Sequence, residues 1–136
     1  MGNIVWELVK PLNQGKAIDS MESRYQIKLP ADLRACIIKN NGGSPYPCTF
    51  DFGENKGKTF GGLLSFNEGD TDSIYKYIKA FETSDGKGVK MFPFGIDPAG
   101  NFLCVKNGNI VFYYHETEQE CFICKTFTEL LDRLYE

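Results

Sequence analysis

The stretch FLCVKNGNIVFYYH at residues 102–115 decides the fold of this chain. Residues 102–106 and 110–115 are rich in β-branched and aromatic side chains, which favour strands. Asn107-Gly108-Asn109 separates the two runs, and Asn-Gly in that position is the strongest short signal for a β-hairpin. The sequence therefore predicts an antiparallel hairpin here.

Further strands are expected on both sides of this hairpin. Residues 91–97 form an apolar run that ends at the turn 98–101, and residues 121–125 have strand composition. Two short strands are expected in the Gly- and Pro-rich middle of the chain, at residues 49–52 and 61–66.

The N-terminal third has the patterns of three helices. Residues 3–12 look like a short amphipathic helix, and residues 16–26 place apolar side chains at helical spacing. Pro30 suits the first position of a third helix, because the N–H at that position makes no hydrogen bond within the helix and proline lacks it. The segment 40–43, Asn-Asn-Gly-Gly, ends that helix with residues that tolerate a positive φ.

Two more helices follow. Asp70 or Thr71 can cap a helix whose apolar residues recur at Ile74, Tyr77, Ile78 and Phe81. Thr126 and Glu129 form a capping box before a closing helix that extends to Leu134. The order of elements predicts an α+β fold in a single domain, residues 1–136. In this fold, helices from the N-terminal part and a C-terminal helix pack around an antiparallel or mixed sheet.

Composition excludes several classes of protein. The net charge of −3 argues against direct nucleic-acid binding, since phosphate contacts need a basic surface. No apolar run approaches the ~20 residues of a transmembrane helix, so no membrane association is expected. No secretory signal is visible at the start of the chain. Five cysteines, an odd and scattered set, favour reduced thiols and a cytoplasmic location.

Catalytic and metal-binding patterns are weak. The sequence has a single histidine, His115, and no motif that would supply a serine nucleophile for it to activate. A small enzyme that uses His115 with an acidic partner is therefore the least favoured hypothesis. A zinc site from Cys104, His115 and the C-x-x-C pair Cys121 and Cys124 is conceivable. Residues three apart on a strand point to opposite faces, however, so we expect no metal and no cofactor.

Three stretches, taken in order, resemble the SUKH superfamily over nearly the whole chain. This superfamily includes fungal cell-wall-synthesis regulators and many bacterial immunity proteins. The stretches are Leu-Pro before the third helix with Asn-Gly-Gly after it, the strand and turn at 92–101, and the hairpin strand and last helix at 110–131. The resemblance marks as fold-defining Leu29, Pro30, Asn41, Gly42, Gly43, Pro93, Asp97, Gly100 and Phe127.

Two of these motifs also have a structural explanation. Asn41-Gly42-Gly43 could hold a ligand, but a helix stop and turn explains it more simply. The Asp97 side chain can accept hydrogen bonds from backbone N–H groups ahead of it, as in an Asx turn.

The resemblance implies a non-enzymatic protein that neutralises a cognate polymorphic toxin, for which a basic nuclease domain is expected, by direct binding. The alternative is an intracellular regulatory scaffold that binds an endogenous protein. The fungal members usually carry disordered tails, which this sequence lacks, so the bacterial interpretation fits better. A monomer or weak homodimer is expected.

Acidic residues are the candidate partner-binding groups, because carboxylates can pair with lysines and arginines of a basic partner. The densest acidic run contains Glu116, Glu118 and Glu120, and a second cluster contains Glu68, Asp70 and Asp72. Solvated loops and helix capping are the alternatives for both. An exposed aromatic residue in the middle segment would be a candidate interface anchor, from among Tyr46, Phe50, Phe52 and Phe60.

Overall fold

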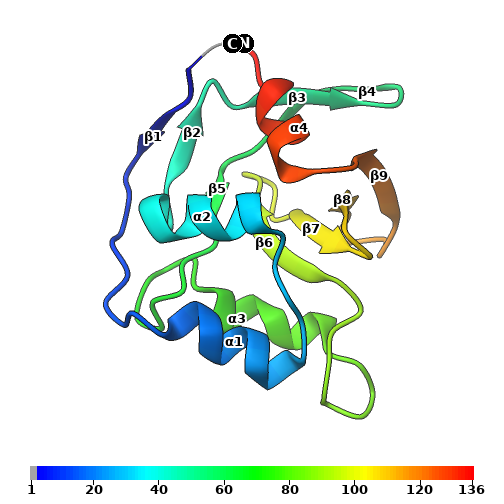
Figure 1. Ribbon diagram of the computed structural model, residues 1–136. Helices are drawn as coiled ribbons and strands as arrows, with labels where there is room; N and C mark the ends of the chain where they lie inside the picture. The colour runs from blue at the N-terminus through cyan, green and yellow to red at the C-terminus, as the bar shows by residue number, and fades with distance from the viewer. Residues whose placement is uncertain (1–2) are drawn as a thin grey trace.

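A five-stranded antiparallel sheet forms the centre of the computed structural model, which describes residues 3–136 (Figure 1). Its strands lie in the order β5-β6-β7-β8-β9. They are β5 (Gly62–Leu63), β6 (Phe92–Ile96), β7 (Phe102–Lys106), β8 (Asn109–Tyr113) and β9 (Glu120–Cys124).

The predicted hairpin is β7 and β8, which pair from Phe102↔Tyr113 to Lys106↔Asn109. Asn107 and Gly108 both have positive φ, 52° and 82°, as a turn matched to the twist of the strands requires. This confirms the prediction made from the Asn-Gly pair.

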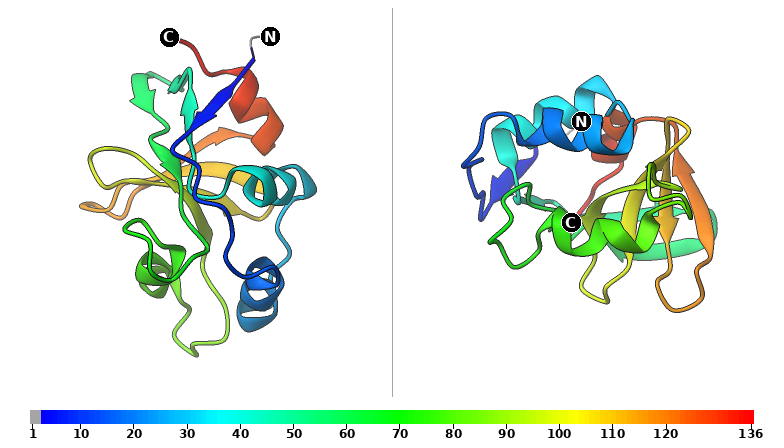
Figure 2. Two further views of the ribbon diagram at one scale, coloured as in Figure 1. Left: turned by 90° about the vertical axis from the view of Figure 1, so that its left-hand side faces the viewer. Right: turned by 90° about the horizontal axis from the view of Figure 1, so that it is seen from below.

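Helices and a second hairpin cover the sheet. The helices are α1 (Ala17–Tyr25), α2 (Ala31–Asn40), α3 (Ile74–Tyr77) with its 3-10 continuation η1 (Ile78–Phe81), and α4 (Phe127–Asp132). Figure 2 shows α3 and η1 on one face of the sheet, and the hairpin of β3 (Thr49–Phe52) and β4 (Asn55–Thr59) on the other, with α4 close to it. The α+β class is therefore confirmed.

The predicted helix at residues 3–12 is wrong. The segment contains the strand β1 (Val5–Glu7), which pairs with β2 (Ser44–Tyr46), 41 positions later at Val5↔Tyr46. Trp6 packs edge-on against Phe60, with ring centroids 6.1 Å apart. Leu8 follows with φ of 58°, which no α-helix accommodates. The apolar pattern of this segment is too short to distinguish a helical from a strand periodicity. Pairing with a distant strand therefore decides its conformation.

Two smaller expectations also need correction. Ser73, rather than Asp70 or Thr71, caps α3, because its hydroxyl accepts a hydrogen bond from the Tyr75 backbone N–H. In the range 61–66, only Gly62 and Leu63 join the sheet. The N-cap of α4 is as predicted, since the Thr126 hydroxyl accepts from the Glu129 N–H at 3.0 Å, but the Glu129 carboxylate accepts from the Lys125 N–H at 3.1 Å instead of from the Thr126 N–H that closes a capping box.

Phenylalanines fill the core between the layers. Phe112 of the sheet lies 6.2 Å from Phe50 and 5.3 Å from Phe52 between ring centroids. Phe94 meets Phe127 of α4 at 5.5 Å, which joins the last helix to the sheet. Burying a phenylalanine contributes about 1.5–3 kcal/mol, so this cluster is a principal source of stability.

Candidate partner-binding surface

The acidic run lies on the connection between β8 and β9. Glu116 and Glu118 are exposed, and the Glu116 side chain retains 84% of its accessible surface. Glu120 begins β9 and forms an ion pair with Lys106, at 2.6 Å between Oε1 and Nζ. Two carboxylates are thus presented to solvent and the third is shared with a lysine.

The second cluster is divided by the fold. Asp70 turns inward, where its carboxylate accepts hydrogen bonds from the Ser65 hydroxyl and the Asn67 amide. Glu68 lies near Tyr75, whose pKa is raised by burial and by that carboxylate. Asp72 stays exposed and accepts a hydrogen bond from the Tyr77 hydroxyl at 3.4 Å.

A row of aromatic rings links Asp72 to the acidic run. Tyr77 packs against Phe102 at 5.2 Å, Phe102 against Phe81 at 5.4 Å, and Phe81 against Tyr113 at 5.0 Å. The pKa of Tyr113 is raised by burial first, and then by nearby acidic groups that include Glu118 and Glu120. Carboxylates more than 40 positions apart in sequence therefore flank one aromatic row.

Phe122 extends this surface along the edge strand β9. It pairs with Val111, and Glu120 pairs with Tyr113, so alternation places Phe122 and Glu120 on the same face of the sheet. Its side chain is 55% exposed. We call this surface the acidic–aromatic face, defined by Asp72, Tyr77, Tyr113, Glu118, Glu120 and Phe122.

The acidic–aromatic face joins carboxylates to an exposed aromatic anchor. Carboxylates can accept charge-assisted hydrogen bonds from arginine and lysine, and exposed aromatic side chains serve as anchors in protein interfaces. Sequence reasoning located its acidic members and missed Tyr77, Tyr113 and Phe122. For Phe122 the sequence did carry a signal. In a regular strand, residues two apart point to the same face, so Phe122 would lie beside Glu120.

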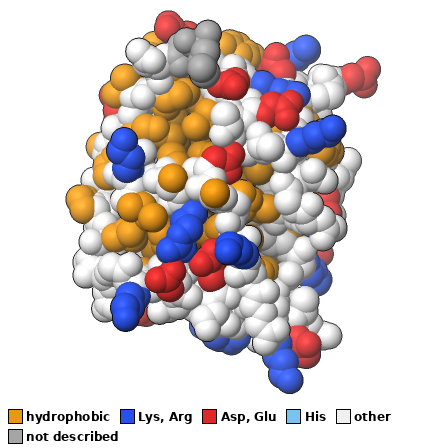
Figure 3. Space-filling model, viewed as in Figure 1, with side chains coloured by type: hydrophobic (Ala, Val, Ile, Leu, Met, Phe, Trp, Pro, Cys, Tyr) orange, Lys and Arg blue, Asp and Glu red, His pale blue; other side chains and the backbone are white. Residues whose placement is uncertain are grey.

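A second surface is apolar and lies over β1, β2 and α2 (Figure 3). Val5, Leu8, Ile38 and Tyr46 are 56%, 76%, 54% and 50% exposed. We call these four residues the apolar face. Tyr46 is the exposed aromatic residue sought in the middle segment, because Phe50, Phe52 and Phe60 are buried.

His115 has a local structural role. Its backbone N–H donates to Asn101 Oδ1 at 3.1 Å, and its ring Nε2 lies 3.1 Å from the Ala99 carbonyl oxygen. These contacts hold the β6–β7 turn beside the β8–β9 connection, and the left view of Figure 2 shows the two projecting together. Glu116 Oε1 is 3.9 Å from the ring.

The cysteine pair in β9 does not follow simple strand alternation. The register shifts between the pairs Val111↔Phe122 and Ile110↔Cys124, so the opposite-face argument fails at Cys124. Burial raises the pKa of Cys124 to about 11 and that of Cys104 well above its usual value, which keeps both thiols protonated at neutral pH. Within residues 3–136, no group of three or more His, Cys, Asp or Glu side chains is placed to hold a metal ion.

Asn41 and Asp97, two of the motif residues, organise backbone around the sheet. Asn41 Oδ1 accepts from the Phe66 N–H at 2.8 Å, and its Nδ2 donates to the Lys10 carbonyl oxygen at 2.8 Å. Asp97 Oδ1 accepts from the N–H groups of Ala99 and Asn101 at 3.0 and 2.7 Å, which is an Asx turn.

The antiparallel sheet with its helical and hairpin layers is an α+β architecture, and its exposed features are surfaces suited to contact with another protein. The sequence profile of the SMI1 / KNR4 family (SUKH-1) matches residues 14–133. The chain therefore belongs to this family, which confirms the resemblance seen in its motifs. No curated protein and no solved structure matches the chain.

Members of this family are generally immunity or regulatory proteins without enzymatic activity. Across residues 3–136, every helix is too short or too polar to cross a membrane.

Proposed function

We propose that this protein is an immunity protein that neutralises a cognate polymorphic toxin, a basic nuclease domain, by binding it through the acidic–aromatic face. One observation carries the proposal: the fold brings Asp72 and Glu118 to the two ends of a single aromatic row. Membership in the family supports it.

Charge and shape both favour a basic protein partner. The chain carries a net charge of −3, and carboxylates facing a basic patch can accelerate encounter by 10- to 1000-fold. Long-range attraction acts mainly on the association rate, whereas a buried aromatic anchor slows dissociation. Phe122 supplies that anchor, because it is large, exposed and flanked by Glu120.

The other predicted acidic residues complete the proposed surface at its margins. Glu116 lies beside His115, and Glu68 lies near Tyr75 on α3, the helix that follows Asp72. Asp70 acts indirectly, since its bonds to Ser65 and Asn67 fix the segment that carries Asp72. We further propose that the protein acts in the cytoplasm as a monomer or weak homodimer. Its five free cysteines suit a reducing compartment.

The test is neutralisation of a defined toxin. The C-terminal domain of a secreted protein encoded next to this gene is expressed with and without this protein, and cell growth and nuclease activity are measured. We expect growth to be restored by the native protein, and lost with the double variant Asp72→Lys/Glu118→Lys and with Phe122→Ala. Glu54→Lys, a reversal at an exposed position in the β3–β4 turn, is the matched control and should protect fully.

A failure of the native protein to neutralise such a toxin would contradict the proposed function. Full protection by both acidic–aromatic face variants would instead show that another surface makes the contact.

The regulatory scaffold is the second candidate, and the apolar face favours it. Contiguous exposed apolar groups on a protein surface commonly mark an interaction site, and these lie apart from the acidic–aromatic face. In that case a stoichiometric endogenous partner should be lost with Ile38→Asp or Leu8→Asp. It should be retained with Asp72→Lys/Glu118→Lys.

A further inference from the structure

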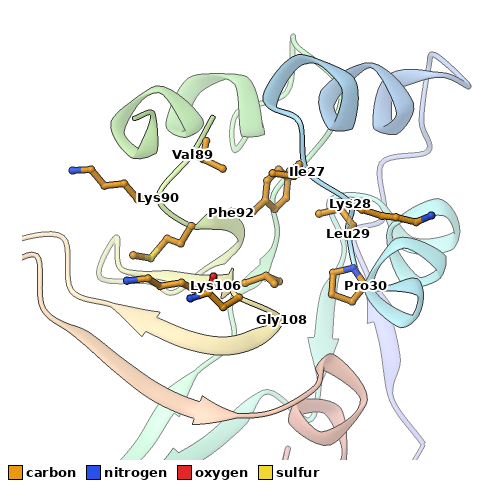
Figure 4. A pocket seen from close by; sticks show the side chains of 12 residues that line it. Ile27, Lys28, Leu29, Pro30, Val89, Lys90, Phe92, Lys106 and Gly108 are labelled. Carbon is orange, nitrogen blue, oxygen red and sulfur yellow. The ribbon is translucent and has the colours of Figure 1, made fainter. Parts of the chain in front are cut away.

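A groove of about 240 Å³ opens between the segment that joins α1 to α2 and the β7–β8 turn (Figure 4). Three short stretches line it, and each comes from a different part of the chain: residues 27–30, 89–92 and 105–108. The groove therefore exists only in the folded protein, and no single motif encodes it.

The floor of the groove is apolar. Leu29, Met91 and Phe92 are only 4%, 3% and 3% exposed, and Ile27 and Val105 are half-buried beside them. An apolar side chain entering here would gain roughly 25 cal/mol for each Å² removed from water.

The rim of the groove is basic, in contrast to the acidic molecule around it. Lys28, Lys90 and Lys106 line it, and no lining residue is acidic. Figure 4 shows Lys28 on one side, with Lys90 and Lys106 on the other. Among the ion pairs of residues 3–136, Lys106 pairs with Glu120, whereas Lys28 and Lys90 take part in none.

The volume sets the size of the occupant. Pockets for drug-sized ligands usually measure about 300–1,000 Å³, so this groove suits one or two side chains rather than a cofactor. Lysines on both sides favour carboxylates on either side of such an anchor.

We propose that the groove binds an apolar anchor residue of a partner protein, in a segment where acidic residues flank that anchor. The inference deepens the proposed function by naming a second determinant on the same partner. The groove adjoins the acidic–aromatic face through Lys106 and Glu120, whose charged atoms are 2.6 Å apart. A partner with a basic patch beside an acidic–apolar segment would meet both signs of charge in only one orientation.

A peptide titration tests this directly, using the full-length protein labelled with ¹⁵N. The probes are N-acetylated, C-amidated hexapeptides, Glu-Glu-Leu-Phe-Glu-Glu and Glu-Glu-Ile-Leu-Glu-Glu, with versions that carry lysine in place of every glutamate. We expect saturable shifts of the Val89, Phe92 and Gly108 amides with the acidic peptides only. The affinity should fall at least tenfold between 50 and 500 mM salt.

Charge reversal of the rim provides the matched comparison. Lys28→Glu/Lys90→Glu changes two exposed side chains, so the fold should be retained, as the dispersion of the spectrum will show. This variant should bind the acidic peptides at least tenfold more weakly, whereas Lys16→Glu, an exposed lysine in the loop before α1, should bind them normally.

Three results would overturn the groove proposal: no saturable shift with either acidic peptide, equal binding of the lysine peptides, or normal binding by the rim variant. None of these results depends on a toxin. Loss of toxin neutralisation with a functioning groove would therefore count against the proposed function alone.

Discussion

Asn41 shows how a single buried side chain holds distant segments together. Its side chain satisfies the Phe66 N–H and the Lys10 carbonyl, and its Nδ2 also lies 3.0 Å from the Ser65 hydroxyl. The residue is 1% exposed, so water cannot replace these bonds if the amide is removed. The N-terminal segment and the loop after β5 therefore share one anchor.

We predict that Asn41→Ala lowers the free energy of unfolding by about 2–4 kcal/mol, because it leaves buried backbone groups unpaired at about 1–3 kcal/mol each. Urea denaturation measures this. Asn40→Ala is the matched control, since the Asn40 side chain makes only a 3.7 Å contact with Cys36 Sγ. Similar losses in the two variants would show that the network contributes little.

Asn41 also marks the limit of prediction from sequence at this scale. Its position in Asn-Asn-Gly-Gly indicated the end of a helix, and α2 does end at Asn40. The partners of its amide are 25 and 31 positions away, and no local rule names them. The same holds for Asp72 and Tyr113, which belong to one surface only because α3 and η1 pack on the sheet.

At the scale of elements, predictions succeeded where the signal was local. The β7–β8 hairpin and α4 carry their own turn and cap, so nearby residues were sufficient. The prediction for β1 failed because its strand partner β2 lies about 40 positions away. The N-cap of α3 is Ser73 rather than Asp70 or Thr71 because Ser65 pairs with Asp72 and Ser73 across the loop. The bulge in β9 could not be predicted for a similar reason, because the register depends on the sequences of both paired strands.

The β3–β4 hairpin yields a pH prediction. Asp51 accepts hydrogen bonds from the Tyr135 hydroxyl at 2.7 Å and the Gly57 N–H at 2.8 Å, and these bonds lower its pKa below 3.8. A lowered folded-state pKa adds stability that is complete above about pH 4 and disappears as pH falls through the folded value.

We therefore expect Asp51→Asn to remove part of the acid sensitivity of the native protein. The measurement is the urea midpoint from pH 6 down to pH 2.5. The native midpoint should fall more steeply below pH 4 than that of the variant, and parallel curves would contradict the assignment.

On the scale of the whole molecule, two of its charged regions adjoin and have opposite sign. The acidic–aromatic face carries Asp72, Glu118 and Glu120, and the groove carries Lys28 and Lys90. The pair Lys106 and Glu120 lies at the boundary. A net charge of −3 conceals this division, which is why composition alone predicted only a basic partner.

The division predicts how association with a basic toxin domain depends on salt. Raising ionic strength from 50 to 500 mM should lower the association rate at least tenfold, while the dissociation rate changes little, because screening acts on the approach of separated charges. Phe122→Ala should do the reverse and raise the dissociation rate. Stopped-flow mixing measures both rates.

Asp72→Lys should slow association more than Glu54→Lys, although both reverse one carboxylate. Equal slowing would mean that net charge, rather than the acidic–aromatic face, directs the encounter.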